Sequence, residues 1–268
     1  MLRRVTDYLA PVRDKVLDRA GVAEGMTLLD VGCGEGMIGF GALEHGASHV
    51  VFADISDDLL EFCHETADAL GVLERCSFVK AGAADLAEIG DASVDVVTTR
   101  SVLIYVSEKA QAFAEFLRVL EPGGRLSCYE PINRFGKEER TTNAFWGYPA
   151  DGVADLSERV EQVFAEIQPD EDPMLDFDER DLIRLAEKAG FFPVELELQA
   201  EIRAIEPRPW KAFLNSSGNP KIPTIAEAME QALTPEERER FSAHLRTLVE
   251  EGQGVWRMAH AYLRAVKH

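Results

Sequence analysis

The sequence predicts an α/β protein with a doubly wound, mostly parallel, seven-stranded sheet that carries helices on both faces and helical cap insertions. Short, nearly continuously apolar segments alternate with segments of helical periodicity through the first half of the chain. Strands that are buried on both faces of a parallel sheet have this composition. A Gly-rich turn follows the first apolar segment. Because such sheets bind ligands at the carboxyl ends of their strands, we expect the ligand site at that turn.

The individual elements are predicted from the spacing of apolar residues. An amphipathic helix is expected over about 3–20, and further helices over 36–44, 56–72 and 178–191. Another helix is expected to start at a Ser107 N-cap and to stop at a Pro-Gly-Gly sequence. Strands are predicted at TLLDVG, HVVFADIS, CSFVKAGAADL, VDVVTTRSVL, RLSCYEP, VELELQAEIRAI and VWRMAHAYLRAV.

The domain organisation is predicted to be a single domain over 1–268. The alternation of strands and helices loosens after Pro131, and no clean linker or repeat follows. Two segments, about 133–177 and 206–252, therefore look like cap insertions into the domain. The N-terminal helix is expected to act as a lid.

The composition excludes some classes of partner. The formal net charge of the chain is -20 at pH 7. An acidic surface repels phosphate backbones and anionic lipid, so neither nucleic acid nor membrane is an expected partner. The chain has no apolar run long enough to span a bilayer and no signal-peptide pattern. The cysteines lack metal-binding spacing and are expected to be reduced, which favours a cytoplasmic location; they are Cys33, Cys63, Cys76 and Cys128.

The Gly-rich turn lies in the stretch LLDVGCGEGMIGFGAL. It has no lysine, which a phosphate-binding P-loop requires, so phosphoryl transfer is not expected. Its glycines stand at 32, 34 and 36, which is GxGxG rather than the GxGxxG of a dinucleotide site. Glu35 lies where a pyrophosphate would approach. This acid suits a ligand that carries positive charge and no phosphate.

Residues 28–128 resemble the class I, Rossmann-like, S-adenosylmethionine-dependent methyltransferases of small-molecule type. LLDVGCGEG is similar to the first motif of that family, and LEPGG resembles its motif after a later helix. The resemblance implies S-adenosylmethionine as the cofactor and S-adenosylhomocysteine as the product. The cofactor-binding residues expected on this basis are Asp30, Gly32, Cys33, Gly34, Gly36, Asp54, Ile55, Ala84, Asp85, Arg100 and Ser101.

Two acids in this set have specific expected contacts. Asp54 ends the second strand, where its carboxylate can accept both ribose hydroxyls, although it could instead cap the next helix. Asp85 resembles the family's acid that accepts the adenine amino group, or it is an ordinary helix-start residue. Ile55 and Ala84 are expected to pack on the faces of the adenine. Asp30 is expected near the methionine end, unless it only braces the loop.

The end of the fourth strand distinguishes substrate classes. It reads Thr-Arg-Ser-Val at 99–102, without the Asn/Asp-Pro-Pro-Tyr/Phe motif of enzymes that methylate amines of nucleic-acid bases. It also lacks the acid that metal-dependent catechol-type enzymes place there. The acidic run at 170–181 has no regular ligand spacing and is interpreted as a solvated loop. No metal site is therefore predicted.

Methyl transfer from a sulfonium is an in-line displacement, so a base is needed only if the nucleophile must lose a proton. The catalytic candidates are Tyr105 and Glu130, with a histidine of the cap as a weaker alternative. Candidates for acceptor binding are Tyr8, Asn133, Arg134, Phe135, Trp146, Tyr148 and Trp210. The aromatic members could equally pack the core of the cap.

The function predicted from the sequence is methyl transfer to an oxygen, nitrogen or carbon atom of a small molecule, in primary or secondary metabolism. Two alternatives stay open: an NAD(P)-dependent oxidoreductase and a non-catalytic cofactor-binding protein. The oligomeric state, monomer or homodimer, and the identity of the acceptor are not predicted.

Overall fold

The computed structural model of the chain describes residues 2–138, 143–218 and 222–268 and contains two compact units. Unit 1 consists of Met1–Pro131, Phe177–Gln199 and His260–His268. Unit 2 consists of Ile132–Asp176 and Ala200–Ala259, and takes in residues of both predicted cap insertions. Two long strands, β8 and β9, have residues in both units.

Unit 1 is built on one seven-stranded sheet. Its strands are β1 (Thr27–Val31), β2 (His49–Asp54), β3 (Cys76–Lys80), β4 (Val94–Arg100), β5 (Leu120–Pro131), β8 (Phe191–Ala204) and β9 (Val255–Lys267). The strand order is β3-β2-β1-β4-β5-β9-β8. Neighbours from β3 to β5 pair in parallel, and β9 pairs antiparallel with β5. The predicted fold class is confirmed.

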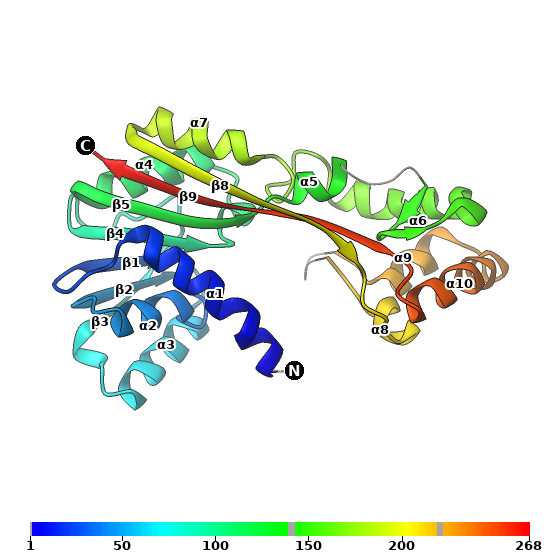
Figure 1. The fold of residues 1–268 in the computed structure, drawn as a ribbon, viewed down its shortest axis with the longest axis horizontal. Helices are drawn as coiled ribbons and strands as arrows, with labels where there is room; N and C mark the ends of the chain where they lie inside the picture. Colours follow the sequence, from blue (N-terminus) through cyan, green and yellow to red (C-terminus); the bar gives the residue numbers. More distant parts are fainter. Residues whose placement is uncertain (1, 139–142, 219–221) are drawn as a thin grey trace. The chain divides into compact units, whose positions relative to one another are not determined.

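Helices cover both faces of this sheet. They are α1 (Leu2–Ala20), α2 (Met37–Glu44), α3 (Asp57–Ala69), α4 (Lys109–Val119) and α7 (Glu179–Ala189), with short 3₁₀ helices η1 (Leu73–Arg75) and η2 (Leu103–Tyr105). Helices α1, α2 and α3 lie on one face, and α4 and α7 pack together on the other (Figure 1). The apolar strands are therefore buried on both sides, as their composition predicts.

The strand order creates the ligand edge of the sheet. Strand β1 lies between β2 and β4: the chain runs from β1 to β2 and β3 on one side and then crosses back to β4 on the other side of β1. In register, Asp30 pairs with Phe52 on one side and with Thr98 on the other. The carboxyl ends of these three strands therefore meet at one edge, at the topological switch point where doubly wound sheets bind ligands.

Unit 2 is mainly helical. Its elements are α5 (Asn133–Glu138), α6 (Ala154–Ile167), α8 (Trp210–Leu214), α9 (Ile225–Ala232), α10 (Pro235–Glu250), η3 (Asp151–Val153) and the small strands β6 (Ala144–Phe145) and β7 (Tyr148–Pro149). Aromatic rings fill its core: Phe145 and Phe241 lie 5.1 Å apart between ring centroids, and Tyr148 and Phe213 lie 5.5 Å apart. This core contains residues from both segments of unit 2.

The prediction that Ser107 is the N-cap of α4 is wrong. The residue at the cap position is Glu108, and its side chain makes no capping hydrogen bond. The amide of Ala112 donates to the carbonyl of Glu108 at 3.0 Å, so helical bonding begins one residue after Ser107. Ser107 belongs to the turn that leaves η2. The helix also ends before the Pro-Gly-Gly sequence, because Leu120 already starts strand β5.

Candidate cofactor site

The glycine loop joins β1 to α2 through three left-handed residues. Gly32, Gly34 and Gly36 have φ angles of 66°, 54° and 78°. A Cβ on Gly32 would lie 2.4 Å from Cγ2 of Val102, whereas a Cβ on Gly34 would meet nothing within 4 Å. Gly32 is therefore required for packing against the turn after β4. Gly34 leaves open space over the loop backbone, which a ligand can approach closely.

Asp54 fastens the second strand to the glycine loop. The residue is 7% exposed, and its Oδ2 accepts a hydrogen bond from the Gly34 amide at 3.0 Å. Oδ1 accepts from the Ser56 amide at 3.0 Å. Ser56 itself is the N-cap of α3 and accepts from the Leu59 amide. Asp54 therefore does not cap the helix, and each of its oxygens keeps a lone pair for another donor.

Asp30 braces the loop from below. It is 2% exposed, and it accepts hydrogen bonds from the Gly39 amide at 3.0 Å and from Oγ1 of Thr98 at 3.1 Å. Burial raises the pKa of Asp30 to about 7, and these two hydrogen bonds oppose the rise. Both oxygens are thus used inside the protein. These contacts agree with the alternative in which Asp30 braces the loop.

The segments after β2 and β3 lie side by side. Ile55 is 74% exposed although it is apolar, and a Cβ on Gly82 would lie 3.5 Å from its Cγ2. The Asp85 amide donates to the Gly82 carbonyl at 2.9 Å, which closes a tight turn with Ala84 inside it. Asp85 is exposed and Ala84 is half-buried. An exposed apolar side chain beside a carboxylate suits the face and edge of a purine.

The turn after β4 contributes Arg100 and Ser101. Arg100 is half-buried at the end of the strand, and Ser101 has a φ of 57°, which is uncommon for a residue with a side chain. The Ser101 amide donates to the Tyr129 carbonyl at 2.8 Å. Tyr105, at the end of η2, is 52% exposed. The predicted residues of this turn therefore lie at the same edge as the glycine loop.

Glu130 is enclosed behind this turn. It is fully buried, and its Oε1 accepts from the Val102 amide at 3.0 Å and from Oγ1 of Thr99 at 3.3 Å. Its Oε2 is buried without a hydrogen-bond partner among the described residues. Burial raises the pKa of Glu130 to about 7, and the hydrogen bonds from the Val102 amide and from Thr99 oppose the rise. Its contacts hold the turn, and it offers no solvent-facing oxygen.

A second cysteine contacts the glycine loop, and no sequence motif predicts this contact. The Cys63 thiol, on α3, donates to the Gly34 carbonyl at 3.3 Å, and Cys33 lies in the loop itself. The neighbouring Cys63 thiol and burial raise the pKa of Cys33, so it stays a thiol at neutral pH. Only the fold brings residue 63 to this place, because α3 packs against β2 and β3.

The acceptor candidates of unit 2 have two kinds of environment. Tyr148 and Trp210 are 0% and 8% exposed and belong to the aromatic core of unit 2. The structure therefore supports their packing role rather than a lid role, because buried rings have no face to offer. Trp146 is half-buried and packs against Phe164.

The remaining acceptor candidates are on α5 and α1. Asn133 is half-buried and its side-chain amide donates to the Met174 carbonyl at 3.1 Å. Arg134 and Phe135 are half-buried. The side chain of Tyr8 lies outside the described residues.

Metal-binding clusters and membrane-spanning helices are two features that the described ranges do not contain. Within residues 2–138, 143–218 and 222–268, no group of three or more His, Cys, Asp or Glu side chains is arranged to hold a metal ion. Across the same ranges, none of the helices combines the length and apolar character that a membrane crossing requires.

The fold and the glycine loop together define a doubly wound α/β protein whose loop lacks the lysine of a P-loop. A family described as a methyltransferase domain matches residues 23–190, which is more than half of the chain. The chain belongs to this methyltransferase family, which confirms the predicted class of enzyme.

Individual relatives match a smaller part of the chain than the family does. Ubiquinone/menaquinone biosynthesis C-methyltransferase of Psychromonas ingrahamii is 32% identical over 128 residues, which are 44% of this chain and 51% of that protein. The chain spans about half the length of the curated relatives that it matches.

Two solved structures share the fold. The YcgJ protein of Bacillus subtilis has a TM-score of 0.58 at 15% identity and covers 96% of this chain and 97% of its own. Geranyl diphosphate C-methyltransferase of Streptomyces coelicolor, solved with S-adenosyl-L-homocysteine, has a TM-score of 0.57 at 15% identity and covers 97% and 76%. At these identities the likeness establishes the fold alone.

Proposed function

We propose that this chain transfers a methyl group from S-adenosylmethionine to a small-molecule acceptor by in-line displacement. The observation that carries the proposal is the placement of Asp54. Its carboxylate ends β2 beside the glycine loop, and each of its oxygens holds one backbone amide. In a chain of the methyltransferase family, this carboxylate is suited to accept the two hydroxyls of a ribose.

The surroundings of Asp54 fit the rest of the cofactor. The exposed Ile55 offers an apolar surface for the adenine, and Asp85 offers an acceptor for its amino group. The loop over Gly34 is open and carries the exposed Glu35. The exposed acid Glu35 on this loop favours a ligand that has a sulfonium and an ammonium over one that has a pyrophosphate.

When bound, S-adenosylmethionine supplies an activated methyl group on a positively charged sulfur. The chain then has to align the acceptor atom with the methyl–sulfur bond and to exclude water. Alignment of two bound groups can lower the barrier by roughly 7–11 kcal/mol. Of the two predicted catalytic residues, Tyr105 is exposed and we propose it as the group that contacts the acceptor.

Four of the predicted acceptor-binding residues stay part of the proposal as the sequence predicts them. Asn133, Arg134, Phe135 and Trp146 stay candidates, because each is half-buried rather than enclosed. The net charge of -20 makes a polyanionic acceptor unfavourable and supports a small molecule. A cytoplasmic location stays part of the proposal, supported by four cysteines that form no disulfide.

Titration calorimetry with S-adenosylhomocysteine tests the cofactor assignment. We expect the protein to bind it, and we expect Asp54→Ala to weaken binding by roughly 100-fold, because two hydrogen bonds to a charged acceptor are lost. Asp58→Asn is the matched control, since Asp58 is an exposed acid on α3. Binding of NAD(P) instead of S-adenosylhomocysteine would refute the proposal in favour of an oxidoreductase.

The transfer itself is tested with a methyl donor that carries a deuterated methyl group. The protein is incubated with this donor and a fractionated metabolite extract, and mass spectrometry follows the label. A labelled product that disappears in Asp54→Ala supports methyl transfer. Cofactor binding without any labelled product would favour a non-catalytic cofactor-binding protein.

A further inference from the structure

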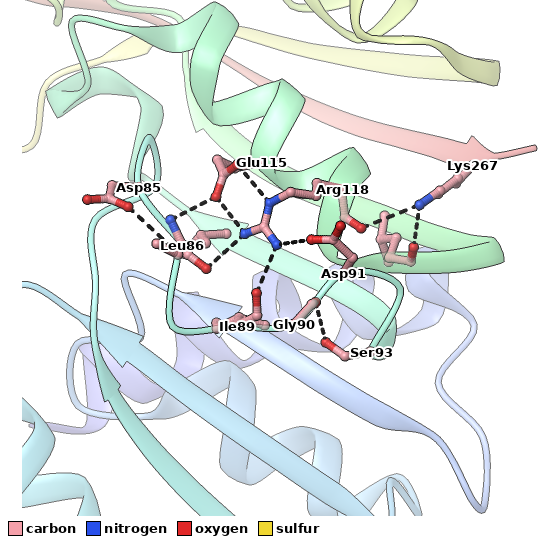
Figure 2. Close-up of polar contacts among 11 residues, drawn as sticks. Asp85, Leu86, Ile89, Gly90, Asp91, Ser93, Glu115, Arg118 and Lys267 are labelled. Carbon is pink, nitrogen blue, oxygen red and sulfur yellow. Dashed lines mark hydrogen bonds and ion pairs between the residues drawn. The ribbon is translucent and has the colours of Figure 1, made fainter.

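Arg118 makes a dense set of hydrogen bonds to the segment that follows Asp85 in the chain (Figure 2). Its guanidinium, in the last turn of α4, donates to the carbonyls of Leu86 and Ile89 at 2.9 Å each. It also donates to Oδ1 of Asp91 at 2.6 Å. One planar fork therefore fixes three points of the segment, a geometry that a lysine cannot reproduce.

Glu115 completes the contact with Leu86. Its carboxylate accepts from Nε and Nη2 of Arg118 at 2.9 Å and 2.7 Å and from the Leu86 amide at 2.9 Å. The hydrogen bond from Arg118 is the main reason that the pKa of Glu115 is lowered. Both the amide and the carbonyl of Leu86 are thus held by one ion pair, and the Leu86 side chain is fully buried.

The same helix end fastens the rest of the segment. The Ala92 amide donates to the Arg118 carbonyl at 2.9 Å, and the Ser93 amide donates to the Val119 carbonyl at 2.8 Å. Lys267 donates to the carbonyl of Leu120 at 2.7 Å (Figure 2). The chain between Leu86 and strand β4 therefore has a fixed path on α4.

Asp85 is the residue immediately before this fastened segment. Its Oδ1 accepts from the Ala87 amide at 3.3 Å, and Oδ2 has no protein partner among the described residues. The backbone position of Leu86 and the amide of Ala87 therefore determine where the Asp85 carboxylate points. An exposed carboxylate on a loop would otherwise sample several rotamers.

We propose that Glu115 and Arg118 are positioning residues that set the affinity for the adenine end of the cofactor by fixing the backbone that carries Asp85. They do not touch the cofactor in this assignment; they act through Leu86. The inference rests on the proposed function, because it takes Asp85 as the acceptor for the adenine amino group.

The test compares two ligands by calorimetry: S-adenosylhomocysteine and its analogue with hydrogen in place of the C6 amino group. Arg118→Lys keeps the charge and loses the fork. We expect it to weaken S-adenosylhomocysteine binding by about fivefold to tenfold and the analogue by less than about twofold, since only the first ligand uses Asp85. Combining Arg118→Lys with Asp85→Ala should add nothing to Asp85→Ala alone.

Arg159→Lys is the matched control. Arg159 in unit 2 forms a similar fork, with Glu237 at 2.6 Å and 3.1 Å and with the Ala232 carbonyl. Its replacement should leave both affinities unchanged. If Arg118→Lys does not fold, as judged by circular dichroism, Glu115→Gln is the second variant, with the same expected selectivity for the amino group.

The outcomes separate the two proposals. Equal losses for both ligands, or unchanged binding by a folded Arg118→Lys and a folded Glu115→Gln, would overturn the positioning role and leave the proposed function intact. Failure of the wild-type protein to bind S-adenosylhomocysteine would overturn both.

Discussion

The candidate residues in unit 1 and in unit 2 have different environments, although both sets were chosen from the same sequence. In unit 1, Asp54 and Ile55 at the end of β2 and Asp85 after β3 lie along one edge of the sheet. In unit 2, Tyr148 and Trp210 are enclosed in the core. The difference shows that strand-end residues are placed by a topology that the sequence pattern predicts, whereas aromatic residues in an insertion can serve packing instead.

The largest expected effect is on the core of unit 2. Phe213 is fully buried and contacts the rings of Tyr148 and Trp210. Phe213→Ala should lower the free energy of unfolding by about 3–5 kcal/mol, because it removes apolar contacts and leaves a cavity. Chemical denaturation followed by tryptophan fluorescence measures this. A loss below about 1 kcal/mol would break the comparison, since unit 2 would then not depend on its aromatic core.

The glycine loop of unit 1 should be nearly as sensitive. Gly32→Ala places a Cβ 2.4 Å from Val102 Cγ2 at a φ of 66°. We expect a loss of about 2–5 kcal/mol, from a left-handed residue and from overpacking. Gly25→Ala is the control, because its φ is 89° and a Cβ there meets nothing within 4 Å. Equal losses at both glycines would contradict a role for the contact with Val102.

The pH dependence of stability tests whether Glu130 is a structural acid or a catalytic base. Burial raises its pKa from 4.5 to about 7, so between these values the folded state binds more protons than the unfolded state. Its contribution to stability is therefore complete below about pH 4.5 and is lost as pH rises through about 7. Between pH 4.5 and 8, the free energy of unfolding of Glu130→Gln should therefore rise by up to roughly 3 kcal/mol relative to that of the wild type.

Asp30 is present in both of these proteins, so its own titration cancels in that difference. Thermal or denaturant unfolding at several pH values gives the result. Methyl transfer by Glu130→Gln should stay within about tenfold of wild type, because glutamine keeps the oxygen that accepts from Val102. A loss of several orders of magnitude in a folded variant would identify Glu130 as the base instead.

The smallest expected effects are at helix caps, where the two units should behave alike. Asp178 is the N-cap of α7 in unit 1, and Thr234 is the N-cap of α10 in unit 2; each forms a capping box. Asp178→Ala and Thr234→Ala should each cost about 1 kcal/mol and leave S-adenosylhomocysteine binding unchanged. Thermal denaturation and calorimetry check both. A cap variant that weakens binding more than about threefold would show that the element does more than pack.

Much of the fold was predictable because its determinants are local. Apolar strands, the glycine turn and the order of elements each follow from residues close in the chain, and the family match at 23–190 agrees with them. The prediction that Ser107 caps α4 was wrong because η2 and the turn after it move the start of the helix by one residue. Short 3₁₀ turns depend on contacts such as those of Glu130, which are distant in the sequence.

The sequence by itself determined the class of the protein, since alternating strands and helices have few topologies and a glycine loop without lysine suits few ligands. Only the tertiary structure decided how individual side chains are used. It enclosed Glu130 behind the turn after β4, placed Cys63 on the glycine loop, and joined Arg118 to the segment after Asp85. The physical reason is that burial and hydrogen-bond partners are properties of packed neighbours, and those neighbours come from parts of the chain that the local pattern does not relate.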